Sequence, residues 1–220
     1  MTPSMIQILA ENNFFYVIDK PAGLSVHNAS PSVSDQLKQL KKPEHFVNRL
    51  DLETSGLMIV AQKPEYHEPL SLALSQGVKT YRTLLRGVID DDKVTCNKPL
   101  TDQAEGRKNP QGVSKIRFPC KTDFLVLRTS DYLTEADAII HTGRQHQIRK
   151  HAALMNHAIV GDKRYNEDKY NEKIFKIYNV NRMFLHARKI EFKFNTADYI
   201  FESTGFSLDI FFNENESQED

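Results

Sequence analysis

The sequence predicts an α+β fold in one folded unit. The chain has 220 residues, of which 40% are hydrophobic and 26% charged, close to an ordinary globular composition. Short apolar runs typical of strands are interleaved with segments whose apolar residues recur at helical spacing. No internal repeat and no Ser/Gly-rich linker divides the chain. A chain of this length supports one large core, so we expect its strands and helices to pack together rather than as two separable domains.

The first third of the chain predicts three strands and two helices. The apolar runs that predict the strands are residues 5–9, 14–18 and 57–61. Residues 34–40 suit a short helix, with Ser32 or Ser34 as its N-cap. Residues 66–76 have helical spacing, and Gly77 is a suitable C-cap for a helix that ends there.

The rest of the chain predicts further strands around one helix. The strand-like segments are residues 79–89, 115–118, 124–129, 134–141, 183–187, 190–194 and 206–212. Three aspartates at 90–92 indicate a turn, and the polar residues 101–113, with two glycines and a proline, indicate a long exposed loop. Residues 144–156 contain no breaker and predict a helix.

The charge balance disfavours a dedicated DNA-coating protein, because such a protein is strongly basic. Twenty-nine Lys and Arg residues match twenty-nine Asp and Glu residues, so the net charge is zero. The last eight residues, 213–220, hold four acids and no base, which leaves a net charge of +4 on residues 1–212. We expect the acidic tail to be disordered and the folded body to be mildly basic.

Features of export, disulfide bonding and membrane insertion are not found in the sequence. Cys96 and Cys120 are the only cysteines and form no CxxC pair, so neither a disulfide framework nor a zinc site is indicated. The first fifteen residues lack the basic start of a secretory signal. The longest clear apolar run, residues 57–61, is far too short to span a bilayer. We therefore expect a cytoplasmic protein that does not bind membranes.

Asp51 is the first candidate for a reactive group. It lies in the segment NRLDLETSG, residues 48–56, which runs directly into the apolar run 57–61. A carboxylate there lies at the rim of the core, two residues after Arg49. Taken alone, the segment favours a simpler interpretation, namely a polar turn with a local ion pair.

Tyr81 and the basic segment 141–151 are further candidates. On a strand, Tyr81 shares a face with the lysine two residues before it, although an ordinary packed tyrosine shows the same pattern. On a helix over 144–156, His146 and Arg149 share a face. Arg144 and Gln145 would begin that helix, where backbone N–H groups favour anions. A solvated basic face is the competing interpretation.

The histidines at 141, 146, 151 and 157 do not predict a metal site. Their spacings of five, five and six residues do not stack on one helical face. No HExxH motif and no carboxylate accompany the cluster. We therefore expect no metal to be bound there.

Five segments, in chain order, carry motifs of one known family. They are DKPAGLSVH, NRLDLETSGLMIVA, KTYRTLLRG, HTGRQHQIRKHAALMNHAIVGDKRY and FLHARKIEF. Together they resemble the RluA-type pseudouridine synthases over most of the chain, and five motifs in order are far more specific than one. The resemblance implies a catalytic domain over residues 1–212. It also implies a long, bent, mostly antiparallel β-sheet with flanking helices and a central active-site cleft.

The resemblance implies a reaction as well. Enzymes of that family isomerise uridine in RNA to pseudouridine, so we expect an isomerase acting on an rRNA or tRNA stem-loop, with neither metal nor cofactor. The family's catalytic aspartate falls on Asp51, its active-site tyrosine on Tyr81, and the arginine that pairs with the aspartate on Arg149. These residue types suit the chemistry, because an ionised carboxylate can attack covalently or offset a developing cation. A neighbouring guanidinium keeps that carboxylate ionised.

RNA contacts are implied in the same way. A stacked uridine must be extruded, at a cost of about a few kcal/mol, and Arg49 resembles the family arginine that enters the space it leaves. The residues expected to contact phosphates are Arg144, Lys150, Lys163 and Arg164. For Lys163 and Arg164 a plain solvated turn is an equal alternative.

Some positions depart from the family pattern without replacing an assigned catalytic group. They include Asn48, Gln145, Lys150 and Asn166, and they bear on the RNA contacts and the target nucleotide. We expect a monomeric, stand-alone catalytic domain without the N-terminal S4-like domain of some relatives. Two other functions stay open: a glycosylase-like hydrolase that uses Asp51 and Glu53, and an RNA-binding module without catalysis.

Overall fold

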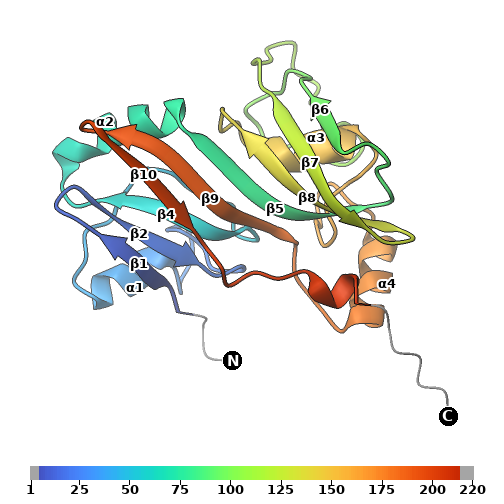
Figure 1. The fold of residues 1–220 in the computed structure, drawn as a ribbon, viewed down its shortest axis with the longest axis horizontal. Helices are drawn as coiled ribbons and strands as arrows, with labels where there is room; N and C mark the ends of the chain where they lie inside the picture. Colours follow the sequence, from blue (N-terminus) through green and yellow to red (C-terminus); the bar gives the residue numbers. More distant parts are fainter. Residues whose placement is uncertain (1–4, 214–220) are drawn as a thin grey trace.

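A computed structural model describes residues 5–213, which build one ten-stranded sheet (Figure 1). The strands are β1 (Gln7–Glu11), β2 (Phe15–Lys20), β3 (His45–Phe46), β4 (Ser55–Ala61), β5 (Val78–Arg86), β6 (Lys93–Cys96), β7 (Thr122–Thr129), β8 (Leu133–Ile140), β9 (Leu185–Phe194) and β10 (Ala197–Glu202). Their order is β1-β2-β4-β9-β5-β8-β7-β6, with β3 beside β4 and β10 beside β9. Every pairing is antiparallel except that of β4 with β9. The predicted α+β fold on a mostly antiparallel sheet is confirmed.

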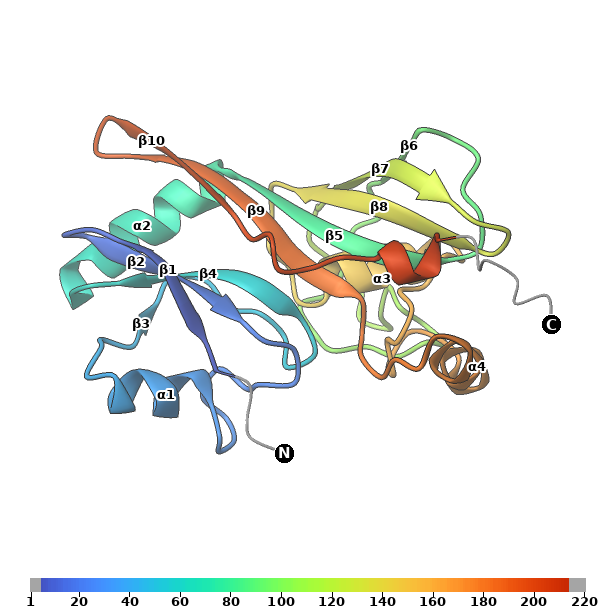
Figure 2. The ribbon, with the colours of Figure 1, turned by 60° about the horizontal axis from the view of Figure 1, so that its bottom comes forward.

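Four helices cover the sheet: α1 (Val33–Gln39), α2 (Pro64–Gln76), α3 (Gln147–Leu154) and α4 (Asp168–Tyr178). Around the N-terminal strands, α1 packs Leu37 on one face and α2 packs Leu70 on the other. In the other half, α3 packs Ile148 against β7 and β8. Figure 2 shows α1 and α3 on the same side of the sheet. Tyr81 contacts the apolar clusters under both helices, so this side is where the two halves of the molecule meet.

Local signals explain where the first two helices begin and end. Ser32, not Ser34, caps α1, and it exchanges hydrogen bonds with Asp35 in a capping box. Pro64 occupies the first turn of α2, where its missing N–H costs nothing, and Gly77 ends the helix as expected.

The junction of the two halves depends on a glycine. β4 runs beside β9 for only two residue pairs, Ser55 with His186 and Gly56 with Ala187. Gly56 has a φ of 111°, and a Cβ atom there would lie 2.4 Å from the Ala187 carbonyl oxygen. The loop that carries Asp51 ends at this junction, so its side chain is presented between the halves.

Several predicted elements differ in the structure. Residues 206–212 form no strand but an irregular segment with a short 3-10 helix (Asp209–Phe211), and residues 115–118 make only one isolated bridge, between Leu100 and Phe118. The predicted strands 183–187 and 190–194 are one strand, β9. The prediction missed β3, β6, β10 and α4. The last is rich in Tyr, Ile and Phe, which also favour strands.

The predicted helix 144–156 begins later, at Gln147, because His146 has a left-handed backbone with a φ of 55°. Residues 214–220 of the predicted acidic tail lie outside the described residues. Within residues 5–213, no helix has both the length and the apolar composition that a membrane crossing requires.

Candidate active site

The structure brings Asp51, Tyr81 and Arg149 together in one pocket. Asp51 lies in the loop before β4, Tyr81 on β5 and Arg149 on α3. The Arg149 Nη1 atom donates a hydrogen bond of 2.8 Å to Oδ2 of Asp51, across 98 residues of sequence. The expected ion pair is therefore present.

A buried lysine, Lys20, holds the loop that carries Asp51. Lys20 has no exposed surface, and its ammonium donates to the carbonyl oxygens of Pro21, Leu24 and Leu52 at 2.9, 2.9 and 3.2 Å. Burial lowers the pKa of Lys20 to about 8. The ammonium thus ties the loop after Asp51 to the turn after β2.

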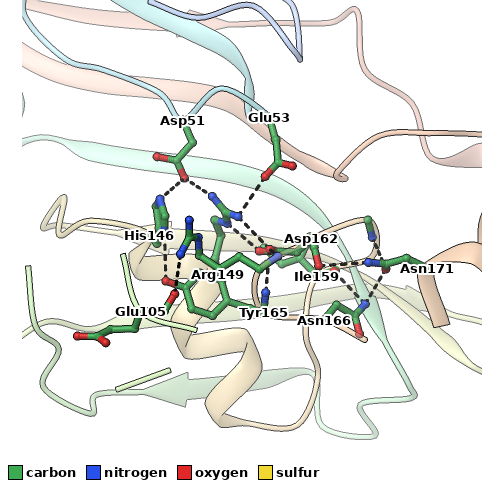
Figure 3. A network of polar contacts seen from close by, with 12 residues as sticks. Asp51, Glu53, Glu105, His146, Arg149, Ile159, Asp162, Tyr165, Asn166 and Asn171 are labelled. Atoms are coloured by element: carbon green, nitrogen blue, oxygen red, sulfur yellow. Dashed lines mark hydrogen bonds and ion pairs between the residues drawn. The ribbon is translucent and has the colours of Figure 1, made fainter. Parts of the chain in front are cut away.

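Arg149 holds more than one carboxylate (Figure 3). Its Nε and Nη2 atoms donate to both oxygens of Asp162 at 2.7 and 2.9 Å, and Nη2 also lies 3.2 Å from Glu53. Asp162 is fully buried and also accepts the backbone N–H groups of Arg164 and Tyr165. Asp162 therefore fixes the guanidinium, which in turn holds the more exposed Asp51.

His146 lies on the other side of Asp51. Its Nε2 atom is 3.6 Å from Oδ2 of Asp51, and its Nδ1 atom is 3.0 Å from the hydroxyl of Tyr165. Burial lowers the pKa of His146 below its usual range, although the charge of Asp51 opposes that shift. The imidazole is therefore neutral near pH 7.

A cleft of about 880 Å³ opens above Asp51. Residues 25–29 and 49–52 line it from one half of the molecule, and residues 143–146 line it from the other. Tyr81 lies half-buried in the smaller pocket below. Burial, and then the charge of Asp51, raise the pKa of the Tyr81 hydroxyl, so this group is protonated at neutral pH.

Arg49 and Arg144 both line the cleft. Arg49 is exposed and forms no hydrogen bond or ion pair with any other residue between 5 and 213. Arg144 donates to Asp102 at 3.0 Å, and its guanidinium lies 4.6 Å from the centre of the Phe118 ring. Both guanidinium groups therefore lie at the cleft, but the one on Arg144 already has an acidic partner.

Lys163 and Arg164 line a neighbouring pocket of about 370 Å³ rather than the cleft. Arg107 and Lys108, from the connection between β6 and β7, line the same pocket. Arg164 donates to backbone carbonyls of that connection at 3.2 Å. These four basic side chains share the pocket with two acids, Glu105 and Asp168, and the contact of Lys163 and Arg164 with phosphates stays a prediction.

The assignment of Lys150 to phosphate binding is wrong. Lys150 has no exposed surface, and its ammonium donates to the carbonyl oxygen of Thr101 at 2.8 Å. It lies on the side of α3 that packs against the start of the long connection between β6 and β7. A phosphate cannot reach a fully buried ammonium, so Lys150 anchors the helix instead.

Sequence reasoning missed the roles of Asp162, Tyr165 and Glu53 around Arg149. The sequence does contain a signal for Asp162. This acid comes directly after an apolar pair, residues 159–160, and a glycine, so its carboxylate lies next to buried backbone. Gly161 has a φ of 82°, and a Cβ atom there would lie 2.0 Å from the carbonyl oxygen of Arg182. That close approach positions the carboxylate that follows it.

The described histidines do not gather with acids or cysteines into a metal-binding arrangement. Between residues 5 and 213, no group of three or more His, Cys, Asp or Glu side chains could hold a metal ion. His151 is fully buried and bonds the Thr122 hydroxyl and the Lys98 carbonyl oxygen.

Comparison with known proteins decides the family. The sequence profile described as RNA pseudouridylate synthase matches residues 14–154, which include Asp51, Tyr81 and Arg149. The chain belongs to this family. Its likeness to two human proteins of known structure, RNA Pseudouridylate Synthase Domain Containing 1 and 4, supports the fold, with TM-scores of 0.76 and 0.72 and 23% and 21% identity. These alignments cover 92% and 89% of this chain and 86% and 87% of those chains.

Two curated relatives act on different RNAs according to their names. A ribosomal large subunit pseudouridine synthase C from Buchnera aphidicola is 34% identical over 84% of this chain and 62% of its own length. A tRNA pseudouridine synthase C from Vibrio vulnificus is 28% identical over 86% of this chain and 85% of its own. The chain thus spans about three fifths of the length of this and two similar ribosomal relatives, and most of the length of the tRNA relative.

Proposed function

We propose that this protein isomerises uridine to pseudouridine in RNA, with Asp51 as the reacting carboxylate. One observation carries the proposal. The Asp51 carboxylate is paired with the buried Arg149 and faces a cleft of about 880 Å³, beside the hydroxyl of Tyr81. An anion held in this way, next to a protonated phenol, supplies the two kinds of group that the reaction needs.

The reaction consumes no water and needs a proton to be moved. The bond from N1 of the uracil to C1′ of the ribose breaks, the detached base turns, and a bond from C5 to C1′ forms. C5 loses a proton and N1 gains one, so atoms and charge balance. Asp51 can attack covalently or offset the cation that develops when the bond breaks. Tyr81, whose hydroxyl is protonated at neutral pH, can stack on the base and transfer the proton.

The substrate that we propose is ribosomal or transfer RNA, because the named relatives act on these two classes. A stacked uridine must leave its helix to reach the pocket at the floor of the cleft. Arg49 is exposed and unpaired among the described residues, and its planar guanidinium suits the gap that the base leaves. We further propose that the enzyme works as a monomer in the cytoplasm.

Incubation of the purified protein with rRNA and tRNA transcripts tests the proposal. Pseudouridine is mapped by carbodiimide-induced stops, and the mass of the RNA is compared before and after reaction. We expect new stops at unchanged mass. Free uracil or cut sugar would instead indicate a hydrolase that uses Asp51 and Glu53, and RNA binding without change would indicate a binding module.

Asp51→Asn is the decisive variant, because it removes the negative charge with almost no change in volume. We expect product formation below a few per cent of the wild-type level, with unchanged RNA affinity. Asp198→Asn, the same exchange at an exposed position on β10, is the matched control and should keep full activity. Substantial turnover by Asp51→Asn would refute the assignment.

A further inference from the structure

The two oxygens of the Asp51 carboxylate have different surroundings (Figure 3). Arg149 Nη1 and His146 Nε2 both approach Oδ2, at 2.8 and 3.6 Å. No residue between 5 and 213 donates a hydrogen bond to Oδ1. The side chains of Arg149 and His146 are 4% and 11% exposed, whereas that of Asp51 is 32% exposed. One oxygen is therefore held by the protein, and the other is left for the cleft.

Tyr165 and Asp51 together favour one of the two neutral tautomers of His146. Burial raises the pKa of Tyr165, so its hydroxyl keeps its proton and can donate to Nδ1, which is 3.0 Å away. A neutral imidazole that accepts at Nδ1 carries its proton on Nε2. That N–H then faces the negative charge of Asp51. The opposite tautomer would set a nitrogen lone pair against the carboxylate.

The backbone holds His146 in an uncommon conformation. Its φ of 55° is strained for a residue other than glycine, and such residues cluster at functional sites. Neighbouring contacts maintain it, because the side-chain oxygen of Gln147 accepts from the Thr142 hydroxyl at 2.6 Å and from the Arg144 N–H at 3.2 Å. The turn is thus built to direct this imidazole at Asp51.

Charged groups around His146 act in opposite directions on its proton affinity. Asp51 and Asp162 raise its pKa, whereas burial, Arg149 and Arg164 lower it, and the lowering effects prevail. Protonation at Nδ1 would also break the hydrogen bond from Tyr165. It would place a second cation on Asp51 and reduce the reactivity of the carboxylate.

We propose that His146, oriented by Tyr165, is a positioning residue that holds Oδ2 of Asp51 and so leaves Oδ1 as the reacting oxygen. This inference rests on the proposed function and adds a residue pair to it. His146 need not touch the RNA, since it acts through Asp51. Its role requires the neutral form, with the proton on Nε2.

Single-turnover rates measured from pH 5 to pH 9 test the pair in two variants. Tyr165→Phe keeps the ring but frees Nδ1, which removes a bond that favours neutral imidazole. We expect its acid limb to move to higher pH and its rate at pH 7 to fall. His146→Asn suits the left-handed backbone but cannot reach both partners. We expect its rate to fall by about 10²-fold, as for a reacting group held slightly out of place, with RNA affinity unchanged.

Tyr199→Phe, which removes a hydroxyl without a polar partner among the described residues, is the matched control and should behave as wild type. Wild-type rates and pH profiles in both Tyr165→Phe and His146→Asn would overturn the inference. Nitrogen NMR of the histidines gives a readout that does not require activity. We expect the Nε2–H tautomer in the wild type and a raised His146 pKa in Tyr165→Phe. Absence of pseudouridine with the wild type would refute the proposed function, whereas an Nδ1–H tautomer would refute only this inference.

Discussion

Arg149→Met is expected to destabilise the protein mainly through Asp162 rather than through Asp51. The guanidinium contacts three carboxylates, but only Asp162 is fully buried and receives two of its hydrogen bonds. The side chains of Asp51 and Glu53 are 32% and 29% exposed, so water can replace the lost partner there. The cost of the substitution therefore depends on the buried acid.

The size of the destabilisation depends on the hydrogen bonds that Asp162 keeps when Arg149 is replaced. Removing one partner of a buried ion pair costs about 3–5 kcal/mol. Asp162 still accepts the N–H groups of Arg164 and Tyr165 at 2.9 and 3.0 Å, so we expect the lower end, about 3 kcal/mol. Activity should collapse as well, because Asp51 loses the hydrogen bond that holds its carboxylate in place. Arg149→Lys should retain part of the stability and part of the activity, since the charge remains while the forked geometry is lost.

Urea unfolding and single-turnover rates for Arg149→Met, Asp162→Asn and the double variant measure these effects. The double variant removes the buried charge together with its partner, so we expect it to recover much of the stability but none of the activity. An Arg149→Met protein within about 1 kcal/mol of wild type would refute the reasoning, because only an exposed ion pair costs so little. A double variant no more stable than Arg149→Met would exclude Asp162 as the cause.

Three further outcomes are expected. Burial lowers the pKa of His186 to about 4, so its contribution to stability is complete above pH 6.5 and is lost as the pH falls towards 4. Urea unfolding of wild type and His186→Gln should differ by about 3 kcal/mol less at pH 4 than at pH 7. Lys150→Met should leave the salt dependence of RNA binding unchanged, whereas Arg144→Met should reduce the log–log slope by about 0.7–0.9 in filter binding. Tyr81→Phe should lose about 10²–10⁴-fold in single-turnover rate at unchanged RNA affinity, and a wild-type rate would exclude proton transfer by its hydroxyl.

Local patterns in the sequence were sufficient for much of the sheet and for the family. The apolar run after Asp51 became β4, and the serine at position 32 became the cap of α1, because both depend on neighbouring residues only. The family motifs located Asp51, Tyr81 and Arg149 correctly enough for the three to meet in one pocket. Their catalytic roles stay predictions until the variants are measured.

Local patterns failed where the partner is distant in the chain. Residues 206–212 alternate like a strand, yet Phe211 packs with Ile174 of α4 in a separate apolar cluster. Lys150 appears in a basic run, yet its ammonium is bound to the carbonyl of Thr101, 49 residues earlier. The spacing of residues within a helix does not indicate which distant segment packs against that helix.

The sequence by itself determined which chemical groups the protein carries, among them the carboxylate of Asp51 before a buried strand, the hydroxyl of Tyr81 on a strand and the guanidinium of Arg149 on a helix. Only the tertiary structure decided how these groups are used. It buried Asp162 behind Arg149, turned His146 towards Asp51 and left one oxygen of that carboxylate without a hydrogen bond from residues 5–213. The reason is physical: hydrogen bonding and charge stabilisation depend on distances of about 3 Å between atoms, and folding sets those distances between residues far apart in the chain.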